Sequence, residues 1–194
     1  MKTKLAPIER PSGLMMKLVY WLSRKQFGKV MTPLKVIFAR LPPSFGTYVQ
    51  KLEKLEQKYQ LPKYMAVLVR THVAQLNTCG FCIDIGKLEV IKHYSDQQDK
   101  FFNVSSYKTS PLFTASEKAA LLYAEELTLH KKISDDTFAE ARNHFTEREL
   151  VEIAWAVTRE HIYNLMNLAF DIESDGLCQI AEPTEKREKR AMVV

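Results

Sequence analysis

The sequence predicts an all-α protein, a bundle of amphipathic helices joined by short connections. Of its 194 residues 46% are hydrophobic, which suffices for a sizeable core in one domain. Six glycines and eight prolines are few for this length, and such sparse turn residues argue against a β-sandwich or barrel. Apolar residues also recur at spacings of three and four along most of the chain, as they do on one face of a helix.

The first expected helix is an amphipathic arm. Leu14, Leu18 and Leu22 share one face, with basic residues between them. Basic residues outnumber acidic ones over the first thirty-five positions, which permits an acidic partner or a membrane surface. A solvated or oligomer-facing helix is the ordinary explanation, and no nucleic-acid motif accompanies the charge. We assign residues 1–42 to this arm, 43–178 to a helical domain, and 179–194 to a charged tail that we expect to be flexible.

Three further helices are expected before residue 95. The first runs from 43 to 60, because the residue before Pro62 is disfavoured in a helix. Pro62 suits the first position of the next helix, whose apolar period continues to Asn77. The third helix follows the two cysteines at 79 and 82. Residues 95–111 lack a firm period and are expected to form an irregular connection or a short helix plus a loop.

Capping motifs mark the helices of the second half. The segments TASE at 114–117 and TERE at 146–149 are capping boxes, in which Thr and Glu satisfy each other's backbone N–H groups. They begin helices that run to about 130 and 168. Ser134 or Asp135 can cap a shorter helix between them, ending near residue 143.

The chemistry is expected at Cys79-Gly80-Phe81-Cys82. Two thiols three positions apart favour redox chemistry or metal binding, although a pair of small buried core residues is the alternative. A thioredoxin-type site requires a β-strand before the cysteines, whereas the approach here is helical. We expect the cysteines at or just inside a helix start, with Asn77 or Thr78 as the cap. A helix N-terminus stabilises a thiolate, which suits a reactive cysteine.

Zinc is the competing use of the thiols. A structural zinc site needs four ligands, but there is no second CxxC, and His72 and His93 lie at spacings unlike those of zinc fingers. We therefore expect no metal and no cofactor. Three cysteines suit a reducing compartment better than a disulfide framework. With no evident signal peptide or membrane-spanning segment, we expect a cytoplasmic protein.

Several segments resemble a known family. RTHVAQLNTCGFCIDIGK at 70–87, SPLFTASEKAALLYAEELT at 110–128, ISDDTFAEARNHFTERELVEIAWAV at 133–157 and the closing NLMNLAFDIES are similar to the carboxymuconolactone decarboxylase family, specifically its alkylhydroperoxidase D-like (AhpD-like) branch. The similarity covers roughly residues 45–175, and FGKVMTPLKV at 27–36 resembles an extension of some members. It implies an all-helical fold assembled as a homo-oligomer, a trimer or a hexamer.

The resemblance also implies roles for the two thiols. Cys82 matches the cysteine that is oxidised to a sulfenic acid, and Cys79 matches the proton donor and resolving thiol. The branch carries a glutamate and two histidines as a proton relay, but this chain has Val67, Phe81 and Gly86 at those positions. All three relay groups are therefore missing.

Other residues can substitute for the missing relay. His72, two turns before Cys79, is our first choice as a substitute base; His93 and the Glu160-His161 pair are further candidates. Asn164 and Asn167 match polar positions of the family's last helix, where they can line a pocket or form interhelical hydrogen bonds.

The sequence thus predicts a thiol oxidoreductase in which Cys82 is the attacking thiolate and Cys79 is the resolving thiol. Its expected substrate is a small hydroperoxide or a disulfide, with an external dithiol as reductant. Activity is expected to be low without the relay. Two alternatives stay open: a decarboxylase or isomerase acting on a small acid, and an oligomeric binding protein whose cysteines are core residues.

Overall fold

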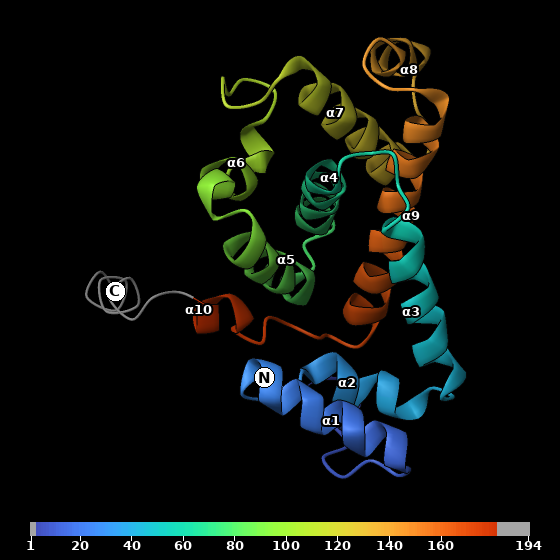
Figure 1. The fold of residues 1–194 in the computed structure, drawn as a ribbon, viewed down its shortest axis with the longest axis vertical. Coiled ribbons are helices and arrows are strands. Elements are labelled where there is room, and N and C mark those ends of the chain that lie inside the picture. Colours follow the sequence, from blue (N-terminus) through green and yellow to red (C-terminus); the bar gives the residue numbers. More distant parts are fainter. Residues whose placement is uncertain (1–2, 182–194) are drawn as a thin grey trace, which may run out of the picture.

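The computed structural model describes residues 3–181 and contains no strand in that range (Figure 1). The all-α prediction is confirmed. The tail beyond residue 181 lies outside the described residues. The helices are α1 (Leu14–Phe27), α2 (Thr32–Val36), α3 (Ser44–Glu56), α4 (Lys63–Leu76), α5 (Gly80–His93), α6 (Gln98–Phe102), α7 (Ala115–His130), α8 (Asp135–Arg142), α9 (Glu147–Ala169) and α10 (Leu177–Ala181).

Helix α4 is the centre of the bundle. It lies in the middle of Figure 1 and packs against α5, α7 and α9. Residues on several of its sides are buried, among them Leu68, Val69 and Val73 with no exposed surface. A helix that is apolar around most of its circumference must be enclosed by others. This explains why the chain wraps its later helices around α4.

The predicted helix starts are confirmed with two corrections. Both capping boxes form as expected, and Ser134 caps α8. Pro62 precedes α4 instead of occupying its first turn. The cap of α5 is Cys79, not Asn77 or Thr78 as expected, because the Cys79 Sγ accepts the N–H of Cys82.

The N-terminal arm packs beneath the bundle with only part of its surface. Phe27 and Ile37 join an apolar cluster with Phe81 of α5 and Leu177 of α10. The face of α1 that carries Leu14 and the leucines one and two turns later stays exposed in the single chain. Assembly into a trimer or hexamer, which would give this face a partner, stays a prediction. Within residues 3–181, no helix has the length and apolar character that crossing a bilayer requires.

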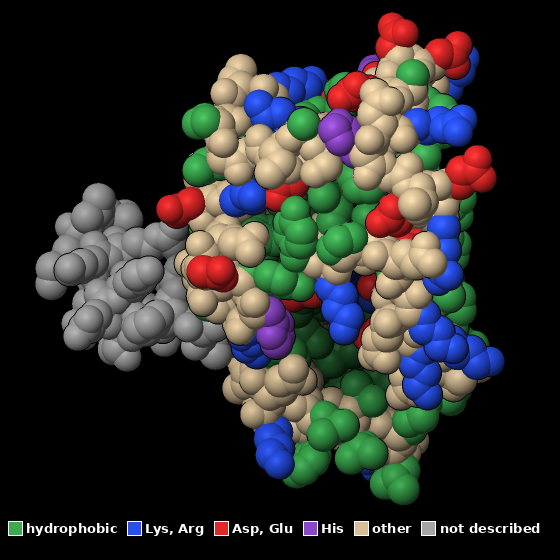
Figure 2. Space-filling model, turned by 45° about the horizontal axis from the view of Figure 1, so that its top comes forward, with side chains coloured by type: hydrophobic (Ala, Val, Ile, Leu, Met, Phe, Trp, Pro, Cys, Tyr) green, Lys and Arg blue, Asp and Glu red, His purple; other side chains and the backbone are tan. Residues whose placement is uncertain are grey.

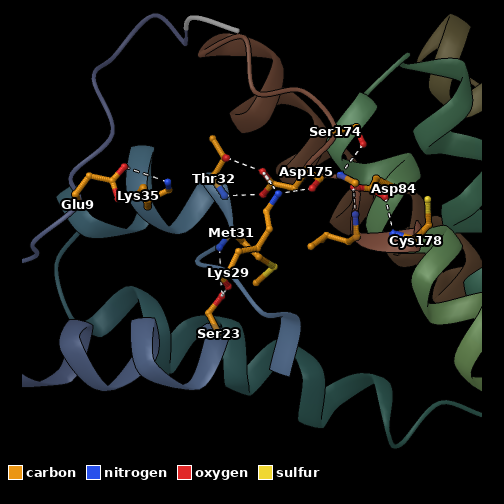
Figure 3. A network of polar contacts seen from close by, with 12 residues as sticks. Glu9, Ser23, Lys29, Met31, Thr32, Lys35, Asp84, Ser174, Asp175 and Cys178 are labelled. Carbon is orange, nitrogen blue, oxygen red and sulfur yellow. Dashed lines mark hydrogen bonds and ion pairs between the residues drawn. The ribbon is translucent and has the colours of Figure 1, made fainter. Parts of the chain in front are cut away.

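Residues 171–176, here called the strap, connect α9 to α10, and contacts at the strap's end and the start of α10 fix it to the arm and to α5 (Figure 3). The Asp175 carboxylate accepts the backbone N–H and the hydroxyl of Thr32, each at 2.7 Å, and its Oδ1 lies 3.3 Å from Lys29 Nζ. Asp84 of α5 accepts the N–H groups of Leu177 and Cys178, both at 2.8 Å. These contacts tie the arm, the strap and α5 together.

Candidate active site

The two cysteines are brought together by the start of α5. Thr78 takes a left-handed conformation (φ 52°) between α4 and α5, and Cys79 follows as the helix cap. Cys79 and Cys82 form a disulfide. Cys79 has no exposed surface, and Cys82 retains 5%. The structure thus places the pair at a helix N-terminus, where backbone N–H groups favour a thiolate once the disulfide is reduced.

A cavity of about 660 Å³ lies beside Cys82. Its walls come from α2, α3, α4, α5 and α9, and Cys82 is one of the lining residues. Figure 2 shows one face of the molecule with a hollow that has hydrophobic side chains in its depth and charged side chains near its opening. Because Cys79 is fully buried, a molecule in the cavity meets the sulfur of Cys82 first.

Helix α9 carries a row of polar side chains, and the last of them contacts Cys82. Asn167, which is 5% exposed, donates from Nδ2 to the Cys82 Sγ at 3.4 Å. One turn earlier Asn164 accepts from Asn77 at 2.8 Å and donates to Glu160 at 2.6 Å. Residues spaced by three and four share a helix face. Asn167 therefore lines the site and Asn164 makes an interhelical bond, so both roles considered from the sequence occur.

Glu160 lies in the wall that Cys82 also lines. Both residues border the main cavity and a second, small cavity of about 60 Å³, which Val67 and Gly86 also line. Burial raises the pKa of Glu160, and this effect outweighs the nearby Arg70 and the hydrogen bond from Asn164, which lower it. Part of the side chain is still accessible, and we attribute that surface to the cavity. Glu160 thus borders the space left by the small residues at two relay positions.

The histidines lie elsewhere. His72 is buried against Tyr107, with ring centroids 5.1 Å apart, and its Nε2 is 3.6 Å from Glu125. That separation exceeds a hydrogen bond, and burial lowers the pKa of His72 to about 4, so the contact is not an ion pair at neutral pH. Since 3.6 residues make one turn, His72 is on a different face of α4 from the cavity-lining Arg70. His93 is exposed at the end of α5.

His161 belongs to the support of the site. Its two ring nitrogens lie 3.4 Å from Asn77 Nδ2 and 3.3 Å from Thr128 Oγ1. The contact with Asn77 reaches the turn that precedes Cys79. Among the described residues there is no cluster of three or more His, Cys, Asp or Glu side chains placed to hold a metal ion.

Known proteins similar to this chain support the resemblance noted above. The uncharacterized protein YnjA of Escherichia coli strain K12 is 31% identical over 164 residues, which cover 84% of this chain and 89% of that protein. A solved structure from Agrobacterium tumefaciens, a candidate antioxidant defence protein AhpD, aligns at 25% identity with a TM-score of 0.65 over 72% of this chain and 96% of its own. The chain belongs to the AhpD-like branch of the carboxymuconolactone decarboxylase family. No family model matches the chain.

A further AhpD-like fold extends the likeness to the arm. The debrominase Bmp8 in complex with 2,3,4-tribromopyrrole has a TM-score of 0.76 at 16% identity, over 93% of this chain and 96% of its own. At that identity the likeness concerns the fold alone. The wider coverage indicates that the arm is part of the shared architecture.

Sequence reasoning missed how the arm contributes to the site. Leu34, Ile37 and Phe38 line the same cavity as Cys82, although more than forty residues separate them in the chain. Their apolar character was visible, but it indicated only that the arm needs a partner surface. Which surface it covers follows from packing between distant segments.

Proposed function

We propose that this AhpD-like protein is a thiol oxidoreductase that reduces a small hydroperoxide or a disulfide with the Cys79/Cys82 pair. One observation carries the proposal: Cys82 borders a cavity large enough for a small molecule, while Cys79 is buried behind it within disulfide distance. An attacking thiol must reach the substrate, whereas a resolving thiol needs only to reach its neighbour. The burial of the two sulfurs matches that division of roles.

For a hydroperoxide the reaction begins with the reduced pair. The Cys82 thiolate attacks the terminal peroxide oxygen, so an S–O bond forms while the O–O bond breaks. The remaining alkoxide takes a proton and leaves as the alcohol, and Cys82 becomes a sulfenic acid. Cys79 then attacks the Cys82 sulfur, the S–S bond forms, and the hydroxyl leaves as water with the proton of Cys79. An external dithiol returns the disulfide to two thiols by exchange and is itself oxidised.

Glu160 is the group we assign to proton transfer. It shares both cavities with Cys82, and its raised pKa brings a carboxyl group closer to the working range of an acid–base catalyst near neutral pH. As the carboxylate it accepts the proton of the Cys82 thiol, and as the acid it returns a proton to the departing alkoxide. The Asn164 amide holds one Glu160 oxygen in place. His72 stays the first base predicted from the sequence, and its position away from the cavity favours Glu160 instead.

The test is stopped-flow reaction of the reduced protein with an organic hydroperoxide. Cys82→Ser should lower the rate by at least about 100-fold, since the nucleophile is lost. Cys79→Ser should permit one reaction per chain and leave a Cys82 sulfenic acid that a dimedone-type probe labels. Cys178→Ser is the control and should react like the wild type. A Cys82→Ser rate equal to the wild-type rate would refute the hydroperoxide version of the proposal.

The same variants separate the alternatives. A decarboxylase or isomerase would keep its activity when both Cys79 and Cys82 are replaced. A binding protein would show no turnover and slow labelling of the reduced thiols. Fast labelling of Cys82 in the reduced protein therefore favours the thiol oxidoreductase.

A further inference from the structure

The size of the cavity beside Cys82 suggests a substrate larger than hydrogen peroxide. Its volume of about 660 Å³ lies within the range of sites for small organic ligands, about 300–1,000 Å³. Residues as far apart as Met31 of the arm and Asn167 of α9 border it. Hydrogen peroxide is too small to contact all of these walls while it reacts at the sulfur.

Aromatic side chains are frequent in these walls. The Phe38 and Phe45 rings of the arm side are 5.4 Å apart and meet at an interplanar angle of 59°. Aromatic rings prefer edge-to-face or offset contacts with one another, so such walls favour a flat aromatic ligand over an aliphatic one of equal size. The aromatic lining residues are Phe38, Phe45, Tyr59, Phe81, Tyr94 and Tyr163.

The charged side chains in the buried walls of the cavity are largely paired within the protein, whereas Glu53 and Lys63, which also line it, are exposed. Arg70 is paired with Glu89 at 3.2 Å, and Arg159 is paired with Glu56. Glu160, the remaining deep carboxyl group, is driven toward its neutral form by burial. A charged ligand would have to compete with these pairs or enter without a counter-charge, which is costly away from water. The cavity therefore suits a neutral molecule.

Several buried polar atoms of the lining residues have no hydrogen-bond partner among the described residues. They include the Tyr59 hydroxyl, Nε of Arg70 and Arg159, and Oδ1 of Asn167. Buried polar atoms are normally paired. These atoms expose almost no surface, so a ligand in the cavity reaches them only after a small rotation of their side chains. Asn167 is the closest of them to the chemistry, because its Nδ2 already contacts the Cys82 sulfur.

We propose that the cavity binds a neutral aromatic molecule whose reducible oxygen group is seated between Asn167 and Cys82 and whose ring extends toward the arm. For a hydroperoxide, a rotation of the Asn167 amide lets Oδ1 accept the O–H and hold the terminal oxygen beside the sulfur. This substrate class rests on the thiol chemistry proposed above. The arm thereby acts as a specificity wall for the cysteines of the bundle.

Binding to the oxidised protein tests the ligand class without any turnover. The probes are 2-naphthol, its saturated counterpart decahydro-2-naphthol, and sodium 2-naphthoate, with dissociation constants measured by titration calorimetry. We expect 2-naphthol to bind roughly ten-fold more tightly than either of the others, the ratio that one or two aromatic contacts provide. Equal affinities for 2-naphthol and decahydro-2-naphthol, or tighter binding of the naphthoate, would overturn the inference.

Two variants locate the binding. Phe45→Leu removes a half-buried ring of the cavity wall and should weaken 2-naphthol binding several-fold. Phe138→Leu removes an exposed ring of α8 that does not line the cavity, and should leave the affinity unchanged. Equal losses in both variants would refute the assignment to this cavity.

Turnover separates the two proposals. Reduced protein should consume cumene hydroperoxide, which is aromatic, at a higher kcat/KM than tert-butyl hydroperoxide, which is not. Tight naphthol binding without any hydroperoxide consumption would refute the hydroperoxide version of the proposed function and leave the ligand class standing. Consumption of both hydroperoxides at equal kcat/KM, without selective naphthol binding, would refute the ligand class and leave the thiol chemistry standing.

Discussion

Replacing Asp84 should destabilise the protein, because Asp84 holds the backbone N–H groups at the start of α10. The Asp84 carboxylate is 3% exposed, and each of its oxygens accepts one backbone N–H, from Leu177 and from Cys178. A hydrogen bond to a charged group contributes about 1.5–3 kcal/mol. Asp84→Asn keeps one acceptor but turns an amide N–H toward the second donor, so we expect a loss of about 2 kcal/mol. Asp84→Ala leaves both donors unpaired and should cost about 3–4 kcal/mol.

The dependence on pH supplies a second readout. Burial raises the pKa of Asp84, but the hydrogen bonds from Cys178 and Leu177 outweigh it and the net pKa is lowered. A lowered pKa means that the folded state holds the proton less tightly than the unfolded state. The stabilisation is therefore present above the ordinary carboxyl pKa and is lost as the pH falls through the lower, folded value. The difference between wild type and Asp84→Asn should shrink accordingly in acid.

Urea unfolding followed by circular dichroism measures both effects. Asp171→Asn is the matched control, because the Asp171 carboxylate forms an exposed ion pair with Lys4 and asparagine tolerates the left-handed φ of 52° at this position. The free energy of unfolding of this control should fall by less than about 0.5 kcal/mol. An Asp84→Asn loss no larger than that of the control, or one that persists unchanged in acid, would refute the reasoning.

Three further outcomes are expected. Glu160→Gln should slow hydroperoxide consumption by the reduced protein by about 100-fold near neutral pH. It should also shift the pH–rate profile to higher pH, and an unchanged profile would exclude Glu160 from proton transfer. Wild type should lose stability as the pH falls from 6.5, the pKa of an unfolded histidine, toward about 4, because a histidine buried in its neutral form must gain a proton on unfolding. His72→Gln should reduce this loss, and identical urea titrations of the two proteins across that window would contradict the prediction. Gly80→Ala places a Cβ 3.3 Å from the backbone N of Ser174 and should cost about 1 kcal/mol in urea unfolding despite the higher helix propensity of alanine; a gain in stability would show that the strap yields without cost.

Local patterns in the sequence predicted most of the helices. The two capping boxes depend on contacts three residues apart, so Thr114 and Thr146 identify their helix starts without any tertiary information. Dependence on local patterns also explains why the cap of α5 was predicted at Asn77 or Thr78 and not at Cys79. A cysteine is a poor cap in isolation, and Cys79 takes that role because the disulfide to Cys82 and the turn at Thr78 fix its position.

The sequence by itself determined an all-α chain with a dithiol at a helix start, because periodicity, capping and the CxxC are all local. The AhpD-like kind was indicated by the resemblance of its segments to that family. Tertiary structure alone decided what surrounds the dithiol. Glu160 of α9 lines the same two cavities as Cys82, and the arm closes the larger one from the opposite end of the chain. Such proximities depend on how separate helices pack, and helical periodicity gives the face of a residue but not the partner of that face.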